Sequence, residues 1–158
     1  MKTKILALLL TLAVLVMGLC SCDLFLGDVD EAGDFTVVVE NTDGSYDVFD
    51  LTLENIENKN EGAKGVLEHL NGRDNDKLYL EMVDSTYGAY VSAIGSIKES
   101  ATDKMYVIVY TSVAADGYEG APTVDYEGTT LYQASAGLSG MKVEAGGIVL
   151  FRLEKSPY

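Results

Sequence analysis

Few side chains in this sequence could carry out catalysis or hold a metal ion. His69 is the only histidine, and the two cysteines, Cys20 and Cys22, lie close together near the amino end. A catalytic triad needs a histidine base beside its nucleophile, and a zinc site needs several histidine or cysteine ligands. His69 follows Glu68 and lies off the apolar stripe of a helical pattern, which is typical of a solvated helix residue. We therefore expect no enzymatic activity, no metal site and no required cofactor.

Acidic side chains are numerous, but they are scattered along the chain. The sequence has 25 Asp and Glu against 11 Lys and Arg, which gives a net charge of −14. Asp74 and Asp76 lie close together, but the surrounding stretch has the polarity of an exposed loop. Nucleic acids and anionic lipids are bound through clusters of Lys and Arg, so this charge balance excludes nucleic acid as a partner. The acids are explained by solubility.

Tyrosine is the residue type that favours a binding role. The chain has ten tyrosines, four phenylalanines and no tryptophan. A tyrosine ring combines a flat apolar surface with a polar tip, which suits binding surfaces, although strands also favour tyrosine for packing alone. Glycine, alanine and serine accompany two tyrosines in the segment 84–95, and such small residues let a ligand or another sheet approach the main chain. Four tyrosines fall on two strands that could be neighbours: Tyr87, Tyr90, Tyr106 and Tyr110.

The amino-terminal residues indicate export. Lys2 and Lys4 precede an apolar run over 5–19, which suits a signal peptide and is short for a membrane span of about 20 residues. Cys22 follows the small residue Ser21 and has Leu19 three places upstream, the pattern of a bacterial lipoprotein. A disulfide between Cys20 and Cys22 would require a strained spacing. We predict a signal peptide over 1–21, a lipidated tether over 22–34 beginning at Cys22, and anchoring to the bacterial cell membrane on its extracytoplasmic side.

Alternating hydrophobic residues predict a chain built mainly of strands. The alternation runs over 35–39 and 49–53, on either side of a hairpin turn at 42–45, and returns at 78–82, 84–97, 129–134 and 148–153. The dense apolar run 105–113 predicts a strand that is buried on both faces. The stretch 114–128 is a glycine-rich acidic loop that carries Tyr118 and Tyr126.

One segment has helical spacing instead. Apolar residues at Ala63, Val66 and Leu70 lie on one side, and Asn58 with Glu61 resembles a capping box before them. Two strands, a helix and then several strands predict a single domain over 35–158. Its expected class is α+β, with a β-grasp-like mixed sheet and one short helix packed against it.

Several of these stretches together resemble a known family. The helix ends at 66–70 and is followed by the strand 78–82, by Tyr87-Gly88-Ala89-Tyr90-Val91-Ser92-Ala93-Ile94-Gly95, by Met105-Tyr106-Val107 and by a terminal strand at 147–151. Over residues 35–153, this looks like the carboxy-terminal domain of transcobalamin and intrinsic factor and of the bacterial lipoproteins that share it. The Gly-x-Tyr-hydrophobic-Ser-x-Ile core is its most specific part.

The resemblance implies a β-grasp domain that covers one side of a flat ligand, cobalamin in the animal carriers. On this basis we predict a surface-anchored lipoprotein that binds a small flat ligand, cobalamin or cobinamide among the candidates, for uptake with a transporter or a second binding domain. Two features differ from the family: this chain has no helical partner domain, and the acidic loop 114–128 is extra. The ligand-binding residues that the resemblance implies are Tyr87, Gly88, Ala89, Tyr90, Ser92, Met105, Tyr106, Val107 and Tyr110.

A second interpretation belongs to another functional class. The same tyrosines could form the centre of an interface, because aromatic residues are enriched there too. The chain would then be a cell-surface module that holds another protein or a glycan, with no small-molecule ligand. A fold alone does not decide between the two functions.

Overall fold

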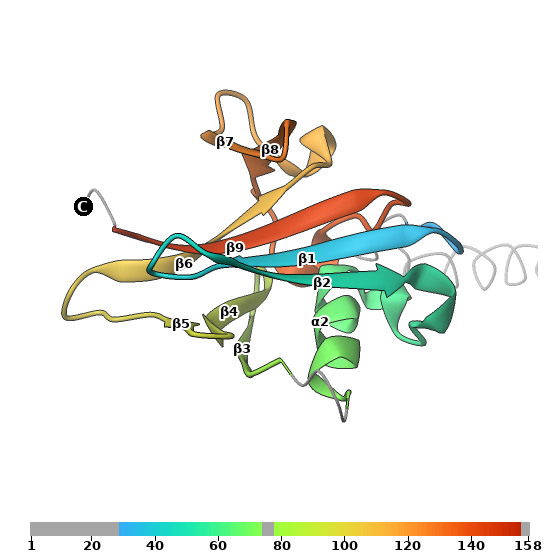
Figure 1. The fold of residues 1–158 in the computed structure, drawn as a ribbon, viewed down its shortest axis with the longest axis horizontal. Coiled ribbons are helices and arrows are strands. Elements are labelled where there is room, and N and C mark those ends of the chain that lie inside the picture. Colours follow the sequence, from blue (N-terminus) through green and yellow to red (C-terminus); the bar gives the residue numbers. More distant parts are fainter. Residues whose placement is uncertain (1–28, 74–77, 156–158) are drawn as a thin grey trace, which may run out of the picture.

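The computed structural model describes residues 29–73 and 78–155 and has the α+β architecture that the sequence predicts. The predicted signal peptide, Cys22 and the first part of the tether lie outside these residues. Within these residues the strands form two sheets, and the one α-helix, α2, packs against the larger sheet beside the smaller one (Figure 1). Among the described residues, no helix is long and apolar enough to cross a bilayer.

The larger sheet has six strands in the order β2-β1-β9-β6-β8-β7. Strand β1 pairs antiparallel with β2 and parallel with β9, and β9 pairs antiparallel with β6, so the last strand lies inside the sheet. The smaller sheet has the order β3-β4-β5 and is antiparallel throughout. The strands are β1 (Asp34–Glu40), β2 (Tyr46–Thr52), β3 (Leu80–Ser85), β4 (Gly88–Ile94), β5 (Ile97–Lys98), β6 (Met105–Thr111), β7 (Thr123–Tyr126), β8 (Thr129–Gln133) and β9 (Gly147–Lys155).

The main hydrophobic core lies between one face of the larger sheet, helix α2 (Ala63–Asn71) and the smaller sheet. Alternation along β1 directs Phe35, Val37 and Val39 into this core, and the helical spacing of α2 adds Val66 and Leu70. All five side chains are nearly inaccessible to water, so their burial is the main force that holds the helix on the sheet.

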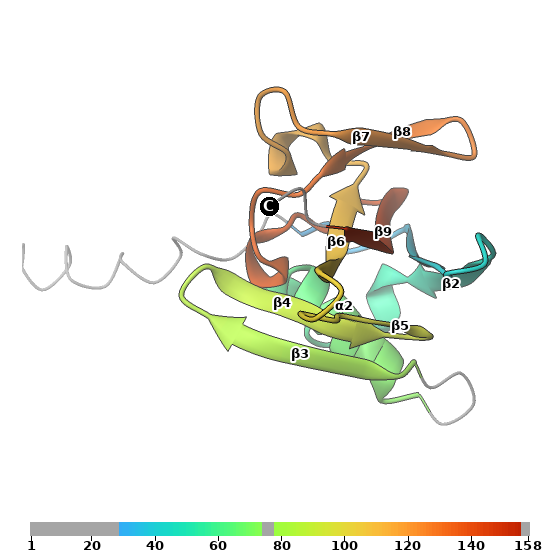
Figure 2. The same ribbon diagram turned by 90° about the vertical axis from the view of Figure 1, so that its left-hand side faces the viewer.

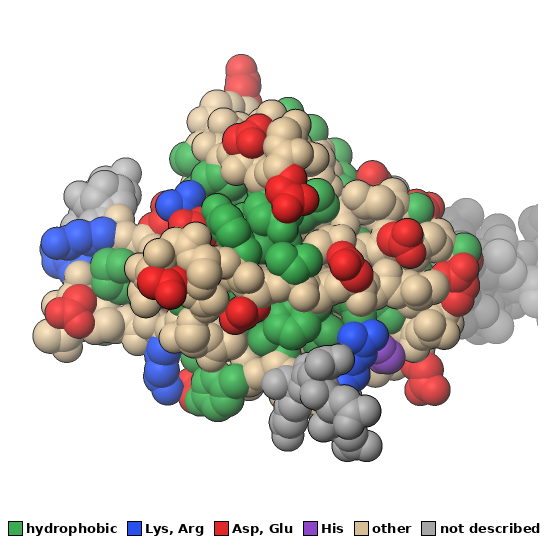
Figure 3. All heavy atoms as spheres, in the orientation of Figure 1, with side chains coloured by type: hydrophobic (Ala, Val, Ile, Leu, Met, Phe, Trp, Pro, Cys, Tyr) green, Lys and Arg blue, Asp and Glu red, His purple; other side chains and the backbone are tan. Residues whose placement is uncertain are grey.

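A second, smaller core lies on the opposite face of the larger sheet, under the β7–β8 hairpin. Val38 and Leu150 project from the sheet and meet Tyr126 and Leu131 of the hairpin. Figure 2 shows β6 running between this hairpin and the β3–β4–β5 sheet. Hydrophobic side chains stay visible where the hairpin meets the sheet, with acidic side chains scattered around them (Figure 3). Strand β7 of this hairpin lies within the stretch 114–128, which the sequence predicted to be an acidic loop.

The start of the helix differs from the prediction. Lys59–Glu61 forms a separate 3-10 turn, and α2 begins after Gly62. Gly62 ends the turn and caps the helix with a φ of 66°, a conformation that favours glycine. Neither side chain of the predicted capping box caps the helix. Helix position Gly65 instead packs against the Asn58 carbonyl, because a Cβ atom there would lie 1.8 Å from that oxygen. Only glycine therefore fits at this position of the helix.

Part of the predicted tether lies against the domain. Val29 forms a parallel bridge with Val143, and the Asp30 N–H donates to the Val143 carbonyl at 2.8 Å. The Asp30 carboxylate accepts the Ala145 N–H at 2.7 Å. The folded unit therefore begins several residues before 35.

Candidate functional site

The main candidate site is an open groove of about 870 Å³ beside the first half of β6. Strands β4, β6, β8 and β9 contribute to its lining, and so do the end of β5 and the loop before β7. The residues that line it are Tyr90, Glu99, Tyr106, Val107, Ile108, Tyr118, Pro122, Gln133, Glu154 and Lys155.

The groove exists because β6 is paired unequally on its two edges. Strand β9 pairs with β6 from Met105 to Thr111, whereas β8 pairs with it only at Tyr110 and Thr111. On that second edge, Met105 exchanges two hydrogen bonds with Ser100, and the Val107 N–H donates to the Glu99 carboxylate at 3.3 Å. A side chain thus occupies the place that a neighbouring strand would take, which leaves room for the groove.

Three tyrosine rings from three separate elements line this groove. Tyr90 comes from β4, Tyr106 from β6 and Tyr118 from the loop before β7, and their exposed fractions are 45%, 39% and 49%. The Tyr118 hydroxyl donates to the Gln133 side-chain oxygen at 3.4 Å. The run 105–113 is therefore less buried than predicted on the face that carries Tyr106, because the hairpin covers only the far end of β6.

Tyr110, a buried residue of β6, fixes one of the carboxylates that line the groove. Tyr110 is 2% exposed, and its hydroxyl donates to Glu154 Oε1 at 2.8 Å. Burial is the main cause that raises the pKa of Tyr110, and the hydrogen bond to Glu154 raises it further, so the phenol stays protonated. Arg152 Nε forms an ion pair with Glu154 at 3.2 Å and lies 3.5 Å from Glu40. The charge of Glu154 is thus compensated within the fold.

The structure brings three of the nine predicted ligand residues into the groove. These are Tyr90, Tyr106 and Val107. Tyr110 is buried and does not line the groove, but its hydroxyl is bonded to Glu154, which does. Met105 lies outside it and lines a separate hollow of about 400 Å³ with Arg152. Tyr87 is 89% exposed in the β3–β4 turn and does not line the groove.

The small residues of the 84–95 segment approach protein, not open space. A Cβ atom at Gly88 would lie 3.1 Å from Gly137 Cα, and the Gly137 N–H donates to the Tyr87 carbonyl at 3.2 Å. Ala89 is buried in the main core. The close approach predicted for Gly88 and Ala89 is therefore made by the chain's own backbone and core.

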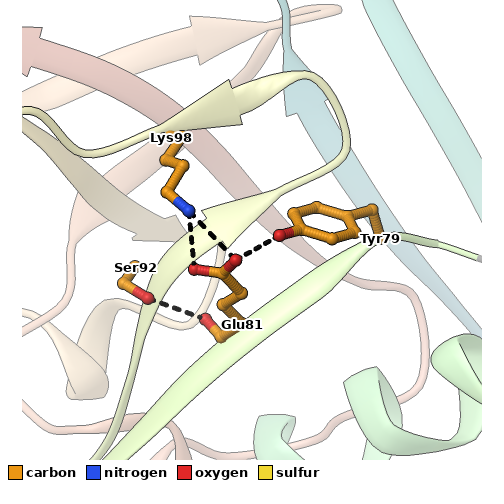
Figure 4. Close-up of polar contacts among 4 residues, drawn as sticks. All are labelled: Tyr79, Glu81, Ser92 and Lys98. Atoms are coloured by element: carbon orange, nitrogen blue, oxygen red, sulfur yellow. Dashed lines mark hydrogen bonds and ion pairs between the residues drawn. The ribbon is translucent and has the colours of Figure 1, made fainter.

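Ser92 lies at an irregularity of the small sheet. Glu81 pairs with Ala93 and Met82 with Val91, so Ser92 is the extra residue of a bulge, and its hydroxyl donates to the Glu81 carbonyl at 3.3 Å. Next to it, the Glu81 carboxylate accepts hydrogen bonds from the Tyr79 hydroxyl and from Lys98 Nζ at 3.0 Å (Figure 4).

This exposed cluster around Glu81 is electrostatically self-contained. The Tyr79 hydrogen bond first, and then Lys98, lower the pKa of Glu81, while Glu81 raises the pKa of both partners. All three groups hold their usual charge at neutral pH. The cluster therefore fastens the sheet surface and offers neither a free acid nor a free base.

Sequence reasoning missed most of the polar lining. Glu99 and Glu154 looked like ordinary surface acids, and Gln133 lay at the end of a predicted short strand. Tyr118 was noted in the acidic loop, but its position beside β6 follows from pairings between distant parts of the chain. The excess of tyrosine was the one local signal that pointed toward it.

No metal centre accompanies the groove. Over residues 29–73 and 78–155, no group of three or more His, Cys, Asp and Glu side chains could hold a metal ion. His69 lines a different hollow of about 340 Å³ beside α2, together with Glu68 and Arg73.

Comparison with known proteins shows a likeness of fold. No protein-family model matches this chain, and no curated protein matches its sequence. A protein of Ruminococcus gnavus ATCC 29149, for which metal binding has been suggested, matches with a TM-score of 0.55 and 14% identity over 78% of this chain and 98% of its own. Haptocorrin in complex with cobinamide matches with a TM-score of 0.55 and 16% identity over 78% of this chain.

At 14% and 16% identity, these matches show a likeness of fold only. The matched part is only 25% of haptocorrin, so the chain resembles one portion of that protein. Haptocorrin belongs to the transcobalamin family, which is the resemblance that the sequence motifs predicted. The chain therefore has a transcobalamin-like fold.

Proposed function

We propose that this chain captures a small flat ligand of the corrinoid type in the groove beside β6, as a lipoprotein anchored outside the cell membrane through Cys22. One observation carries the proposal: Tyr90, Tyr106 and Tyr118 come from three elements and expose their rings to one open groove. Exposed rings offer flat apolar area to a planar ligand. The transcobalamin-like fold supports this reading, because one protein with the fold holds cobinamide.

The shape of the groove bears on affinity. A flat ligand covered on one face buries about 300 Å² of apolar area, worth about 7 kcal/mol at 25 cal/mol per Å². Association costs an estimated 4 to 15 kcal/mol, so contact on one face binds weakly. Tyr118 and Pro122, from the loop before β7, add a second wall to the groove besides Tyr90 of β4. Tight binding requires that this wall contact the ligand, or that a second binding domain or a transporter cover it.

The test is whether a coloured ligand stays with the protein. The purified full-length chain is mixed with cobalamin, cobinamide and haem in turn, and each mixture is passed through a gel-filtration column. Corrinoid absorbance that travels with the protein is the expected result. Colourless protein after mixing with ligand at high micromolar concentration would contradict the proposal.

A second candidate function has an observation of its own. The outer surface of the β3–β4 hairpin exposes several large hydrophobic side chains, and Val83 lies directly opposite Tyr90. Exposed aromatic surface next to a polar rim is typical of an interface with a protein or a glycan. The exposed residues of this surface are Tyr79, Val83, Tyr87 and Tyr90. Under this alternative, the chain is an adhesion module, and replacing Tyr79 and Val83 would abolish partner binding while the groove stays intact.

A further inference from the structure

We propose that the groove selects ligands that carry a positive charge, and that the Glu99 carboxylate interacts with this charge. This inference rests on the proposed function, because it assigns a chemical class to the ligand of the same groove. Its basis is the combination of an uncompensated carboxylate with three exposed aromatic rings.

Glu99 is the carboxylate whose charge the fold leaves available. Its one hydrogen bond accepts the neutral Val107 N–H at 3.3 Å. Within the described part of the chain, Glu99 takes part in no ion pair, whereas Glu154 is paired with Arg152 at 3.2 Å. A carboxylate has about four acceptor positions, so most of the acceptor capacity of Glu99 stays unused.

The rings beside Glu99 favour the same kind of ligand. The face of an aromatic ring is negative, and a cation over a tyrosine face gains about 0.5 to 2 kcal/mol, depending on how far it is desolvated. Tyr90, Tyr106 and Tyr118 expose their rings to the groove that Glu99 lines. Ring faces and a carboxylate in one hollow stabilise an organic cation by two independent interactions.

One cation of the protein also lines the groove. Lys155 is exposed at the end of β9, and its flexible stem lets the ammonium turn toward water. Lys155 therefore offers a second test of the inference, because removing its positive charge should strengthen the binding of a cation. The net charge of −14 also attracts cationic ligands at long range.

The experiment compares two probes of the same shape. The cation (4-hydroxyphenyl)trimethylammonium and the neutral 4-tert-butylphenol differ only by nitrogen against carbon at the branched centre. Binding of each to the full-length chain is measured by NMR titration. We expect the cation to bind about tenfold more tightly or better, a ratio that corresponds to about 1.4 kcal/mol.

Variants locate the source of this preference. Glu99→Gln keeps an oxygen for the Val107 N–H but removes the charge, and it should abolish most of the preference for the cation. Lys155→Gln should increase the affinity for the cation more than the affinity for the neutral probe, because it removes a positive charge from the groove lining. Glu57→Gln, an exposed position outside the groove, is the matched control and should change neither.

The outcomes separate this inference from the proposed function. Equal affinity for both probes, no binding of either probe, or a preference that survives in Glu99→Gln would overturn charge selection. The co-elution of a corrinoid would still stand in each of these cases. If no coloured ligand co-elutes but the cation preference follows Glu99, the ligand class proposed here holds and the corrinoid assignment fails.

Discussion

The hydroxyl of Tyr110 donates a 2.8 Å hydrogen bond to Glu154 Oε1, which links β6 to a groove-lining residue of β9. Tyr110 is almost fully buried, so its hydroxyl has lost contact with water and depends on this partner. The bond holds a groove carboxylate in place.

Replacing Tyr110 by phenylalanine tests this link. Tyr110→Phe removes the hydroxyl and leaves the ring, and we expect the free energy of unfolding to fall by about 1.5 kcal/mol in urea denaturation. Tyr79→Phe is the control, because Tyr79 also donates to a glutamate but is exposed to water. An equal loss in both variants would show that burial does not strengthen the Tyr110 bond.

The contact between Gly88 and Gly137 predicts a strong steric effect. A Cβ atom at Gly137 would lie 2.5 Å from the Tyr87 carbonyl oxygen, and that backbone cannot move aside without breaking the β3–β4 turn. Gly137→Ala should therefore reduce the free energy of unfolding by about 2 kcal/mol. Gly140→Ala is the control in the same segment, since its nearest neighbour would be 3.6 Å away. A Gly137→Ala protein as stable as Gly140→Ala would contradict the packing.

Asp116 predicts a pH dependence of stability. Burial raises the pKa of this carboxyl group, and the Lys142 N–H at 2.8 Å offsets part of that shift. Because the folded protein holds this proton more tightly than the unfolded chain, the contribution is fully present below the ordinary pKa of an aspartate. It is lost as the pH rises through the raised folded-state pKa.

Asp116→Asn removes that titration and keeps an oxygen for the Lys142 N–H. The stability of the variant relative to the original chain should therefore increase as the pH is raised from about 3 to about 7. Urea denaturation at each pH measures the difference. A difference that does not change with pH would refute the assigned shift.

Two groove tyrosines predict the location of ligand binding. Tyr90→Ala and Tyr106→Ala should each weaken the binding of the ligand found by co-elution by about tenfold, since each removes one contacting ring. Tyr87→Ala is the matched control, because Tyr87 is exposed outside the groove. Titration followed by absorbance measures all three. If only Tyr87→Ala weakened binding, the ligand would sit on the β3–β4 turn instead.

The proposed anchor predicts a clear division between the two cysteines. Cys22→Ser should move the protein from the membrane fraction to the soluble fraction and remove the mass of the lipid from the mature chain. Cys20→Ser should leave both properties unchanged, because Cys20 lies in the predicted signal peptide. Mass spectrometry of each fraction is the measurement, and lipid on a Cys22→Ser protein would falsify the assignment.

Local patterns in the sequence predicted most of the elements but not how they associate. Alternation located β1 and β9, and apolar spacing located α2, because these signals depend on near neighbours alone. The division into two sheets depends on pairings between distant segments, such as Phe35 with Gly147, which no local pattern contains. Strand β7 was hidden because acidic and glycine residues surround it.

The candidate site was predictable to the extent that it depends on residue type. Tyr90 and Tyr106 could be named because tyrosine is abundant in this chain and the family resemblance covers both positions, and both line the groove. Glu99 could not, because its role follows from the single hydrogen bond to Val107 at an edge that β8 leaves free. Gly88 was assigned to a ligand from its small size and the family resemblance. Its actual neighbour, Gly137, is remote in sequence and could not be inferred from a local pattern.

Strand β9 lies between β1 and β6, although it is the last strand along the chain. Synthesis delivers the amino end first, so β1 and β6 cannot be joined in one sheet until residues 147–155, which form β9, have been made. Such late, non-local closure makes for slow folding. If the chain is exported as we propose, this late completion of the larger sheet would keep it unfolded while it crosses the membrane.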